Sequence, residues 1–155
     1  MDIAINLILK KTTNKHSRRQ KIPKYIKEKV KKCIKGKIKI GSFEESILVE
    51  LNPWTREDYE RQWREGLDRL KVYDRSCLVV SVGNPEDSAV VEWWVLYRVG
   101  NTIFVQNEHL SHDTYKNIVG ERPFTPDTCY AFIGPRETHT EDGHKISEWS
   151  VPWTE

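Results

Sequence analysis

The sequence has no long apolar run, few cysteines and no complete catalytic signature, and each absence removes a class of protein. No stretch of about 18 apolar residues occurs, which excludes a membrane-spanning helix. The apolar opening, residues 1–9, is short, and basic residues follow it rather than precede it, the reverse of a secretory signal. We therefore expect a cytoplasmic protein.

Cysteine is scarce and scattered. The chain has three cysteines, Cys33, Cys77 and Cys129, with no Cys-x-x-Cys pair. An odd number of widely spaced cysteines in a chain without a signal favours reduced thiols in a reducing compartment. Cys77 and Cys129 each begin an apolar run, so we interpret them as buried core residues rather than as nucleophiles.

The motifs of common enzymes are also missing. The chain has no glycine-rich phosphate loop, no nucleophile elbow and no dinucleotide fingerprint. His109, His112, His139 and His144 have spacings seen in zinc sites, but no cysteine pair or His-Glu-x-x-His helix accompanies them. We predict no metal, cofactor or catalytic residue. A small nuclease that uses the histidines and acids of residues 137–144 stays as an alternative, although one loop supplies only part of an active site.

Charge divides the chain into two parts. Residues 1–42 contain fourteen Lys/Arg and two acidic residues, a net charge of +12. Residues 43–155 contain eleven Lys/Arg and twenty-one acidic residues, a net charge of −10. We therefore predict a basic N-terminal segment over residues 1–42 and an acidic α+β domain over residues 43–155.

The basic segment has several interpretations. Apolar residues at spacing four predict an amphipathic helix over residues 24–35, and residues 35–40 alternate as in a short strand. The segment could bind nucleic acid or an anionic membrane surface. So much like charge on little apolar surface more simply predicts a weakly ordered tail. Its composition, rich in Lys, Ile and Asn, would also fit an upstream extension of a shorter protein.

The acidic part has a clear order of elements. Alternating and continuous apolar runs predict strands, and Tyr59, Trp63, Leu67 and Leu70 form one stripe of a helix capped by Thr55. The order is β-α-β-β-β-α-β-β, a largely antiparallel sheet covered by one main helix. The predicted elements are strands 46–52, 75–82, 88–99, 102–108, 127–134 and 145–151, and helices 55–70 and 110–119.

The strongest tertiary prediction is a hairpin around Gly100-Asn101. A two-residue loop that begins with glycine pairs Val99 with Thr102. This register puts Trp93 and Glu108 on one face and Trp94 on the other. Because both faces are half apolar, we expect the hairpin to lie in the centre of the sheet.

Composition favours a protein-binding function for the acidic part. All six tryptophans lie in it, more than one core of this size requires, and tryptophan is enriched at interfaces. An acidic surface attracts basic partners and repels nucleic acid. Alternatively, the tryptophans are all core and the charge only keeps the protein in solution. The candidate partner-binding residues are Glu137, Glu141, Asp142, Asp127, Glu121 and the hairpin aromatic Trp93.

Several sequence strings carry a family resemblance. They are Leu51-Asn-Pro-Trp-Thr55, Gln62-Trp-Arg-Glu-Gly66, Glu92-Trp-Trp94, Phe104-Val-Gln-Asn107, Pro123-Phe-Thr-Pro-Asp-Thr-Cys-Tyr130 and the stretch from Pro135 to Trp149. With these strings, residues 46–153 resemble immunity proteins of bacterial contact-dependent growth inhibition systems, the CdiI-like group. The resemblance implies a cytoplasmic, non-enzymatic protein that binds one cognate toxin, often a nuclease. A basic toxin would fit the acidic charge.

Overall fold

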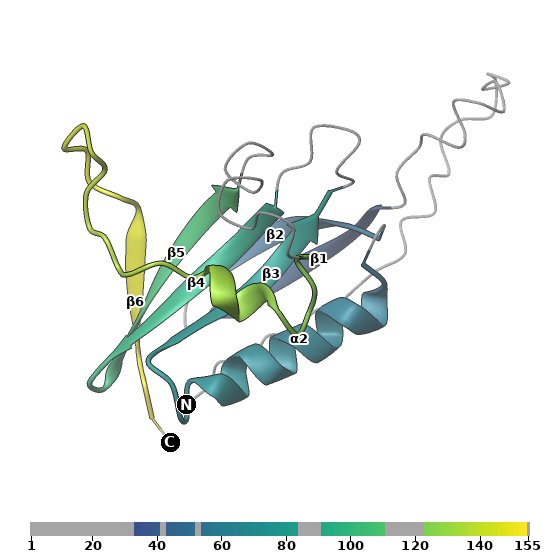
Figure 1. Cartoon of the computed structure of the whole chain (residues 1–155), viewed down its shortest axis with the longest axis horizontal. Helices are drawn as coiled ribbons and strands as arrows, with labels where there is room; N and C mark the ends of the chain where they lie inside the picture. Colours follow the sequence, from purple (N-terminus) through teal and green to yellow (C-terminus); the bar gives the residue numbers. More distant parts are fainter. Residues whose placement is uncertain (1–32, 41–42, 52–53, 84–90, 111–122, 155) are drawn as a thin grey trace, which may run out of the picture.

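The computed structural model describes residues 33–40, 43–51, 54–83, 91–110 and 123–154 (Figure 1). No helix in these ranges is long and apolar enough to cross a membrane. The elements are β1 (Cys33–Ile40), β2 (Phe43–Glu50), α2 (Arg56–Arg69), β3 (Arg75–Val82), β4 (Val91–Val99), β5 (Thr102–Leu110), the 3-10 helix η2 (Cys129–Phe132) and β6 (Glu148–Pro152).

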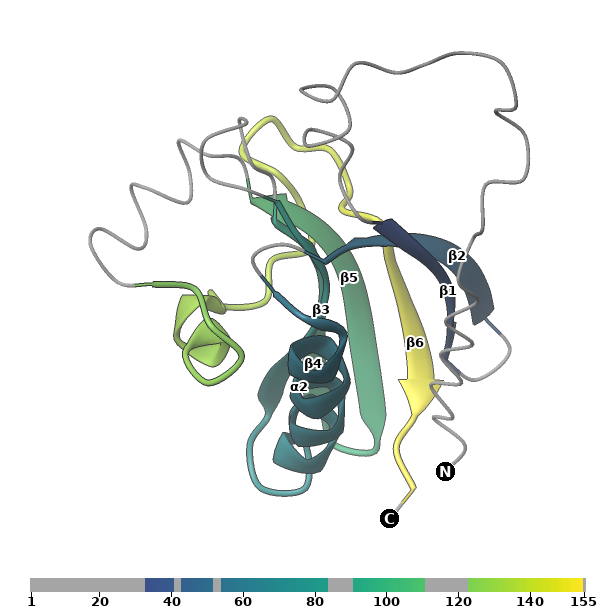
Figure 2. The ribbon, with the colours of Figure 1, turned by 90° about the vertical axis from the view of Figure 1, so that its right-hand side faces the viewer.

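The described strands form two antiparallel sheets. The main sheet has the strand order β3-β4-β5-β6, and β1 pairs with β2 in a separate hairpin. Figure 2 shows the main sheet between the β1–β2 hairpin on one side and η2 on the other, with α2 lying along β3. The predicted α+β fold, an antiparallel sheet with one main helix, is confirmed.

The central hairpin has the predicted register. Val99 pairs with Thr102, and Trp93 lies opposite Glu108. Gly100 has a φ of 60°, a conformation that glycine adopts without steric cost. Strands β4 and β5 occupy the middle of the main sheet, as expected for a hairpin that is apolar on both faces.

Helix α2 begins with the predicted cap. The Thr55 hydroxyl accepts a hydrogen bond from the Asp58 backbone N–H at 3.2 Å, and the Asp58 carboxylate accepts one from the Thr55 N–H at 2.9 Å. This reciprocal capping box satisfies two backbone donors at the helix start. Tyr59 and Trp63 are buried, which confirms the core of the predicted apolar stripe.

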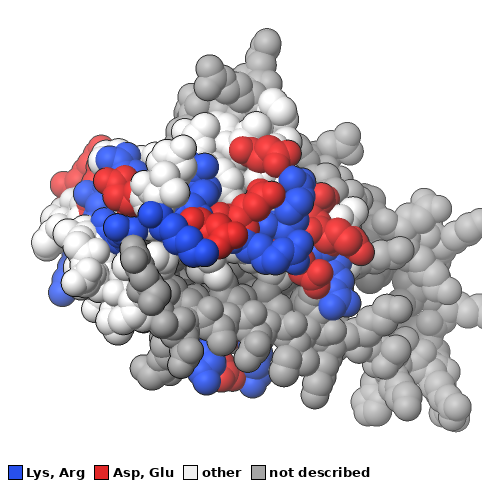
Figure 3. Space-filling model, turned by 90° about the horizontal axis from the view of Figure 1, so that it is seen from below, with Lys and Arg blue, Asp and Glu red and all other residues white. Residues whose placement is uncertain are grey.

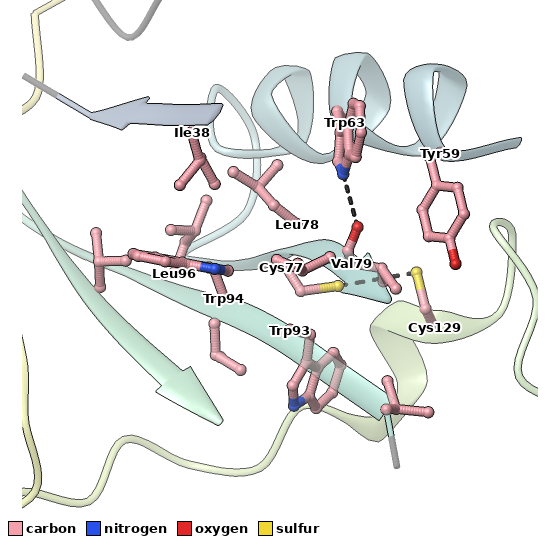
Figure 4. Packing of buried hydrophobic residues seen from close by; sticks show 14 of the residues in the cluster. Ile38, Tyr59, Trp63, Cys77, Leu78, Val79, Trp93, Trp94, Leu96 and Cys129 are labelled. Carbon is pink, nitrogen blue, oxygen red and sulfur yellow. Dashed lines mark hydrogen bonds between the residues drawn. The ribbon is translucent and has the colours of Figure 1, made fainter. Parts of the chain in front are cut away.

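Three side-chain bonds join α2 to the outer edge of β3. The Gln62 amide donates from Nε2 to the Cys77 carbonyl at 2.8 Å and accepts at Oε1 from the Val79 N–H at 2.8 Å. The Trp63 indole N–H donates to the Val79 carbonyl at 2.7 Å (Figure 4). Because an unpaired backbone group that is buried costs about 1–3 kcal/mol, these bonds stabilise an edge that no described strand covers.

Gly66 allows the helix to lie this close to the strand. A Cβ atom at this position would overlap the carbonyl oxygen of Cys77 and press on the side chain of Leu78. The Gly66 carbonyl also accepts a hydrogen bond from the Ser76 hydroxyl. The glycine is therefore required by the close approach of α2 to β3, since any side chain would push the two elements apart.

Tyr59 connects β2 to β3. Its hydroxyl donates to the Glu50 carbonyl at 2.7 Å and accepts from the Val82 N–H at 2.9 Å. The Glu50 N–H in turn donates to the Ser81 hydroxyl at 3.2 Å. Burial raises the pKa of Tyr59 well above its usual value, so the hydroxyl stays protonated and keeps its donor.

The core fills both faces of the main sheet. Trp94 points toward the side of the sheet on which Ile38 of the β1–β2 hairpin lies, and Trp93 points toward the opposite side (Figure 4). The ring of Trp93 packs edge-on against Phe124, with 5.7 Å between the ring centroids. Cys77 and Cys129 are fully buried with their sulfur atoms 3.8 Å apart, which confirms both as core thiols.

The predicted strand over residues 127–134 is wrong. This segment begins with reciprocal hydrogen bonds between Thr125 and Thr128 and continues into the 3-10 helix η2. Cys129 and Phe132, three residues apart, are the buried positions of η2, which fits the period of a 3-10 helix. The apolar run was long enough for a strand, but the Thr-Pro-Asp-Thr turn before it set a helical start.

The structure describes residues 33–40 of the basic segment. Strand β1 begins at Cys33, so the C-terminal end of the helix predicted over residues 24–35 is extended instead. The rest of that prediction, and residues 111–119 of the predicted second helix, lie outside the described residues. Since β1 pairs along its whole length with β2, the change of charge near residue 42 falls within a hairpin. The division at residues 42 and 43 stays a prediction.

Candidate protein-binding surface

The six residues predicted to bind a partner lie in different places. Glu137, Glu141 and Asp142 belong to the loop between η2 and β6, and Asp127 precedes η2. Figures 1 and 2 show this loop projecting away from η2, so the structure does not bring Asp127 together with the loop acids. Trp93 is in the core, and Glu121 lies outside the described residues.

The loop over residues 135–147 is a compact hairpin of its own. His139 and Lys145 form a β-bridge, and the Thr140 N–H donates to the His144 carbonyl at 2.8 Å. The tip closes with a bond from the Gly143 N–H to the Thr140 carbonyl at 2.9 Å, where Gly143 has a φ of 83°. Side chains on this loop are therefore carried by hydrogen-bonded backbone rather than by an open coil.

An ion pair fixes the base of the loop to the sheet. The Arg136 guanidinium donates from Nη2 to Glu148 at 2.6 Å and from Nε at 3.0 Å, a two-point contact. The same guanidinium lies 3.8 Å from the ring centre of Phe104. Gln106, which is buried, donates both to Glu148 at 2.7 Å and to the carbonyl of Glu137 at 2.8 Å. The loop is thus anchored on β5 and β6.

The tip of the loop carries only negative formal charge. Residues 137–144 contain Glu137, Glu141 and Asp142 and no lysine or arginine. All eight residues are exposed, and none of the three carboxylates forms an ion pair among the described residues. The three acids are therefore accessible to a partner, and the hydrogen-bonded hairpin of the loop holds their backbone in place.

Sequence reasoning missed Glu108, which lies on β5 beside this loop. Burial raises the pKa of its carboxyl, and the negative charge of Glu137 raises it further. Burial and the charge of Glu108 also raise the pKa of Tyr97 to about 12. No described lysine or arginine lies within ion-pair distance of Glu108. The hairpin register had placed Glu108 on this face, but the contribution of the distant loop was not visible in the sequence.

Asp127 has a different environment. Its carboxylate forms an ion pair at 2.8 Å with Arg61 of α2, which also approaches Glu65 at 3.8 Å. Figure 3 shows acidic and basic side chains intermixed on this side of the molecule, where Arg56 pairs with Glu60 at 2.8 Å. The outer face of α2 therefore has no single sign of charge, in contrast to the loop tip.

The tryptophans do not form an exposed surface. Trp54, Trp63, Trp93 and Trp94 are each at most 5% exposed, and Trp149 and Trp153 are partly buried. The prediction that Trp93 contacts a partner is corrected, because a side chain 1% exposed cannot reach one. The buried sheet has two wide apolar faces, which accounts for the large number of indoles without an interface.

The described histidines are exposed. His139 and His144 belong to the loop, and His139 Nδ1 lies 2.9 Å from the Thr138 hydroxyl. His109 is exposed on β5, and His112 lies outside the described residues. In the part of the chain that the structure describes, no group of three or more histidine, cysteine or acidic residues has a geometry for holding a metal ion.

Known proteins are similar to this chain in sequence and in fold. A family model described as the CdiI N-terminal domain matches residues 49–155. A curated protein named "Immunity protein CdiI" from Enterobacter cloacae subsp. cloacae is 34% identical over 113 residues, which cover 72% of this chain and 74% of the relative. A chain of the solved CdiA-CT/CdiI toxin and immunity complex from Enterobacter cloacae matches with a TM-score of 0.64 and 31% identity, covering 77% of this chain and 79% of that one.

Proposed function

The chain belongs to the CdiI family of immunity proteins, and on this premise we propose that it binds and neutralises a cognate CdiA-CT toxin in a contact-dependent growth inhibition system. Its role is to bind rather than to catalyse, and it acts in the bacterial cytoplasm, where an incoming toxin would meet its target. The solved relative is a toxin and immunity complex, which supports a toxin domain as the partner class.

The observation that carries the finer proposal is the unpaired acidic tip of residues 137–144, with Glu108 beside it. A nuclease binds the phosphate backbone through basic side chains, so its active surface is positively charged. Three carboxylates on an anchored loop are complementary to such a surface and would occupy the place of substrate phosphates. We therefore propose that the toxin is basic and a nuclease, and that Glu137, Glu141 and Asp142 are contact residues.

Asp127 and Glu121 belong to the proposal in a lesser role. Asp127 already pairs with Arg61, so a toxin cation would have to compete with that guanidinium. Substituting Asp127 should therefore change the association rate less than substituting one of the unpaired loop acids. Glu121 precedes the same segment in the sequence and is kept as a candidate contact on its charge alone.

The test measures association of the full chain with its cognate toxin domain. Neutralising the tip with Glu137→Gln, Glu141→Gln and Asp142→Asn should lower the association rate constant about tenfold or more at low salt, since long-range attraction sets that rate. A matched control, Glu57→Gln, Asp68→Asn and Asp74→Asn, makes the same charge change elsewhere and should lower it less than about threefold.

The wild-type association rate should also fall as salt rises from about 50 mM to about 500 mM, because salt screens exposed charges. Equal effects of the tip variant and the control, or a rate independent of salt, would exclude the loop as the docking site. His139→Ala separates binding from catalysis: toxin neutralisation should survive this change, whereas an enzyme that uses His139 would lose its activity.

A further inference from the structure

Strand β1 presents a row of lysines to solvent. Lys35, Lys37 and Lys39 are exposed, and the residues between them, Gly36 and Ile38, are buried against the core. Because alternate residues of a strand point to the same side, these three side chains lie on one face, about 7 Å apart along the strand. We name Lys35, Lys37 and Lys39 the lysine row.

Little negative charge opposes the lysine row. Across the hairpin its three members pair with Leu48, Ser46 and Glu44 in order. Glu44 forms an ion pair with Lys37 at 2.8 Å, with both side chains about half exposed. An exposed pair of this kind contributes little to stability, so it holds Lys37 only weakly.

The lysine row also lies along an accessible edge. Strand β1 pairs only with β2 among the described strands, so none of these strands lies along its other side. Figure 2 shows the β1–β2 hairpin on the flank of the main sheet opposite η2. The family model begins at residue 49, so the row lies outside the residues that this model matches.

We infer that the lysine row binds the phosphate backbone of a single-stranded nucleic acid without sequence preference. Three cations in single file fit a linear polyanion, which can follow the strand and avoid the acidic remainder of the protein. A planar anionic membrane would instead approach a larger part of residues 43–155, which carry a net charge of −10. The sequence before β1 is also basic, with eleven Lys/Arg and one acid in residues 10–32.

The experiment measures binding of the full chain to a labelled mixed-sequence RNA of about 20 nucleotides by fluorescence anisotropy over a range of salt. The variant Lys35→Gln, Lys37→Gln, Lys39→Gln should raise the Kd about tenfold or more. It should also reduce the slope of log K against log salt by about 2, the effect of three lost phosphate contacts on a single strand. The matched control is Arg64→Gln, Lys71→Gln, Arg75→Gln, which has the same net charge and should leave the slope within about 0.5 of wild type.

A second variant guards against a folding defect. Lys35→Gln with Lys39→Gln leaves the Lys37–Glu44 pair in place and should still reduce the slope by more than about 1. An unchanged slope in both variants, or an equal change in the control, overturns the inference. So does stronger binding to vesicles with anionic lipid headgroups, or equal competition by polyglutamate. Toxin neutralisation should be unaffected in the row variants, so the outcome is independent of the proposed immunity function.

Discussion

The contact between α2 and β3 and the loop over residues 135–147 use polar side chains in opposite ways. At the first, Gln62 is buried and both ends of its amide are bonded within the protein. At the second, Glu137, Glu141 and Asp142 are exposed and form no ion pair among the described residues. The difference separates polar groups that hold the fold from those available to a partner. Substitutions at the first should change stability, and substitutions at the second should change binding.

The largest loss of stability is expected for Gln62→Leu. The side chain would keep its size but leave the Cys77 carbonyl and the Val79 N–H buried without partners, each at a cost of about 1–3 kcal/mol. Urea unfolding should show a loss of about 3 kcal/mol. Glu57→Gln, on the exposed side of the same helix, is the control and should change stability by less than about 0.5 kcal/mol. A loss below about 1 kcal/mol for Gln62→Leu would mean that the β3 edge is stabilised by something else.

Gly66→Ala tests the close approach at the same contact. Alanine favours a helix over glycine by about 1 kcal/mol, but its Cβ would overlap the Cys77 carbonyl, and overpacking costs about 1–3 kcal/mol. We expect a net loss of about 1–2 kcal/mol in urea unfolding, with unchanged toxin affinity per folded molecule. A stabilised variant would show that α2 can move away from β3 at no cost.

Arg136→Met tests the anchor between the two regions and should change both properties. Removing the two-point contact to Glu148 should cost about 1–2 kcal/mol, the value for bonds between charged groups reduced for partial exposure. Hydrogen bonding from Arg136 lowers the pKa of Glu148. The pair therefore stabilises the folded state fully at pH values above the carboxyl pKa of the unfolded chain. This stabilisation is lost as the pH falls through the lowered pKa of Glu148 in the folded protein. The difference between wild type and variant should shrink on acidification from pH 7, and a constant difference would contradict the linkage.

Glu108→Gln should have the smallest effect on stability, with the opposite sign. Burial and Glu137 raise the pKa of Glu108 in the folded state, so the folded protein is favoured while this carboxyl is protonated. That contribution is lost as pH rises through the raised pKa. At pH 7 the variant should be more stable by less than about 1 kcal/mol, and this gain should vanish near pH 4. Toxin affinity should fall, and a gain in both properties would remove Glu108 from the binding surface.

The sequence predicted those parts of the fold that depend on local rules. The Gly100-Asn101 turn set the register of β4 and β5, and Thr55 set the start of α2. Gln62 and Gly66 were missed as core positions, although they follow Tyr59 at helical spacing, because an apolar count omits an amide and a glycine. Their burial depends on the β3 edge, which is a tertiary feature.

The candidate site was predictable only in part. The acids of residues 137–144 stand together in the sequence, so their common exposure on one loop followed from composition. Trp93 was misplaced because interface statistics for tryptophan do not distinguish a wide two-sided core from an exposed patch. Glu108 was missed because its neighbour Glu137 is far away in the chain, and only the folded loop brings the two charges together.

Gln62 also has a consequence for how molecules of this protein meet one another. Its amide offers β3 one donor and one acceptor, as a peptide group of an adjoining strand would. An uncovered edge of this kind can template the addition of another chain and lead to aggregation. Because Gln62 already bonds the Cys77 carbonyl and the Val79 N–H, these two groups at the centre of the edge are not available to another strand. We therefore expect the amide that stabilises the fold also to disfavour the addition of another strand at this edge.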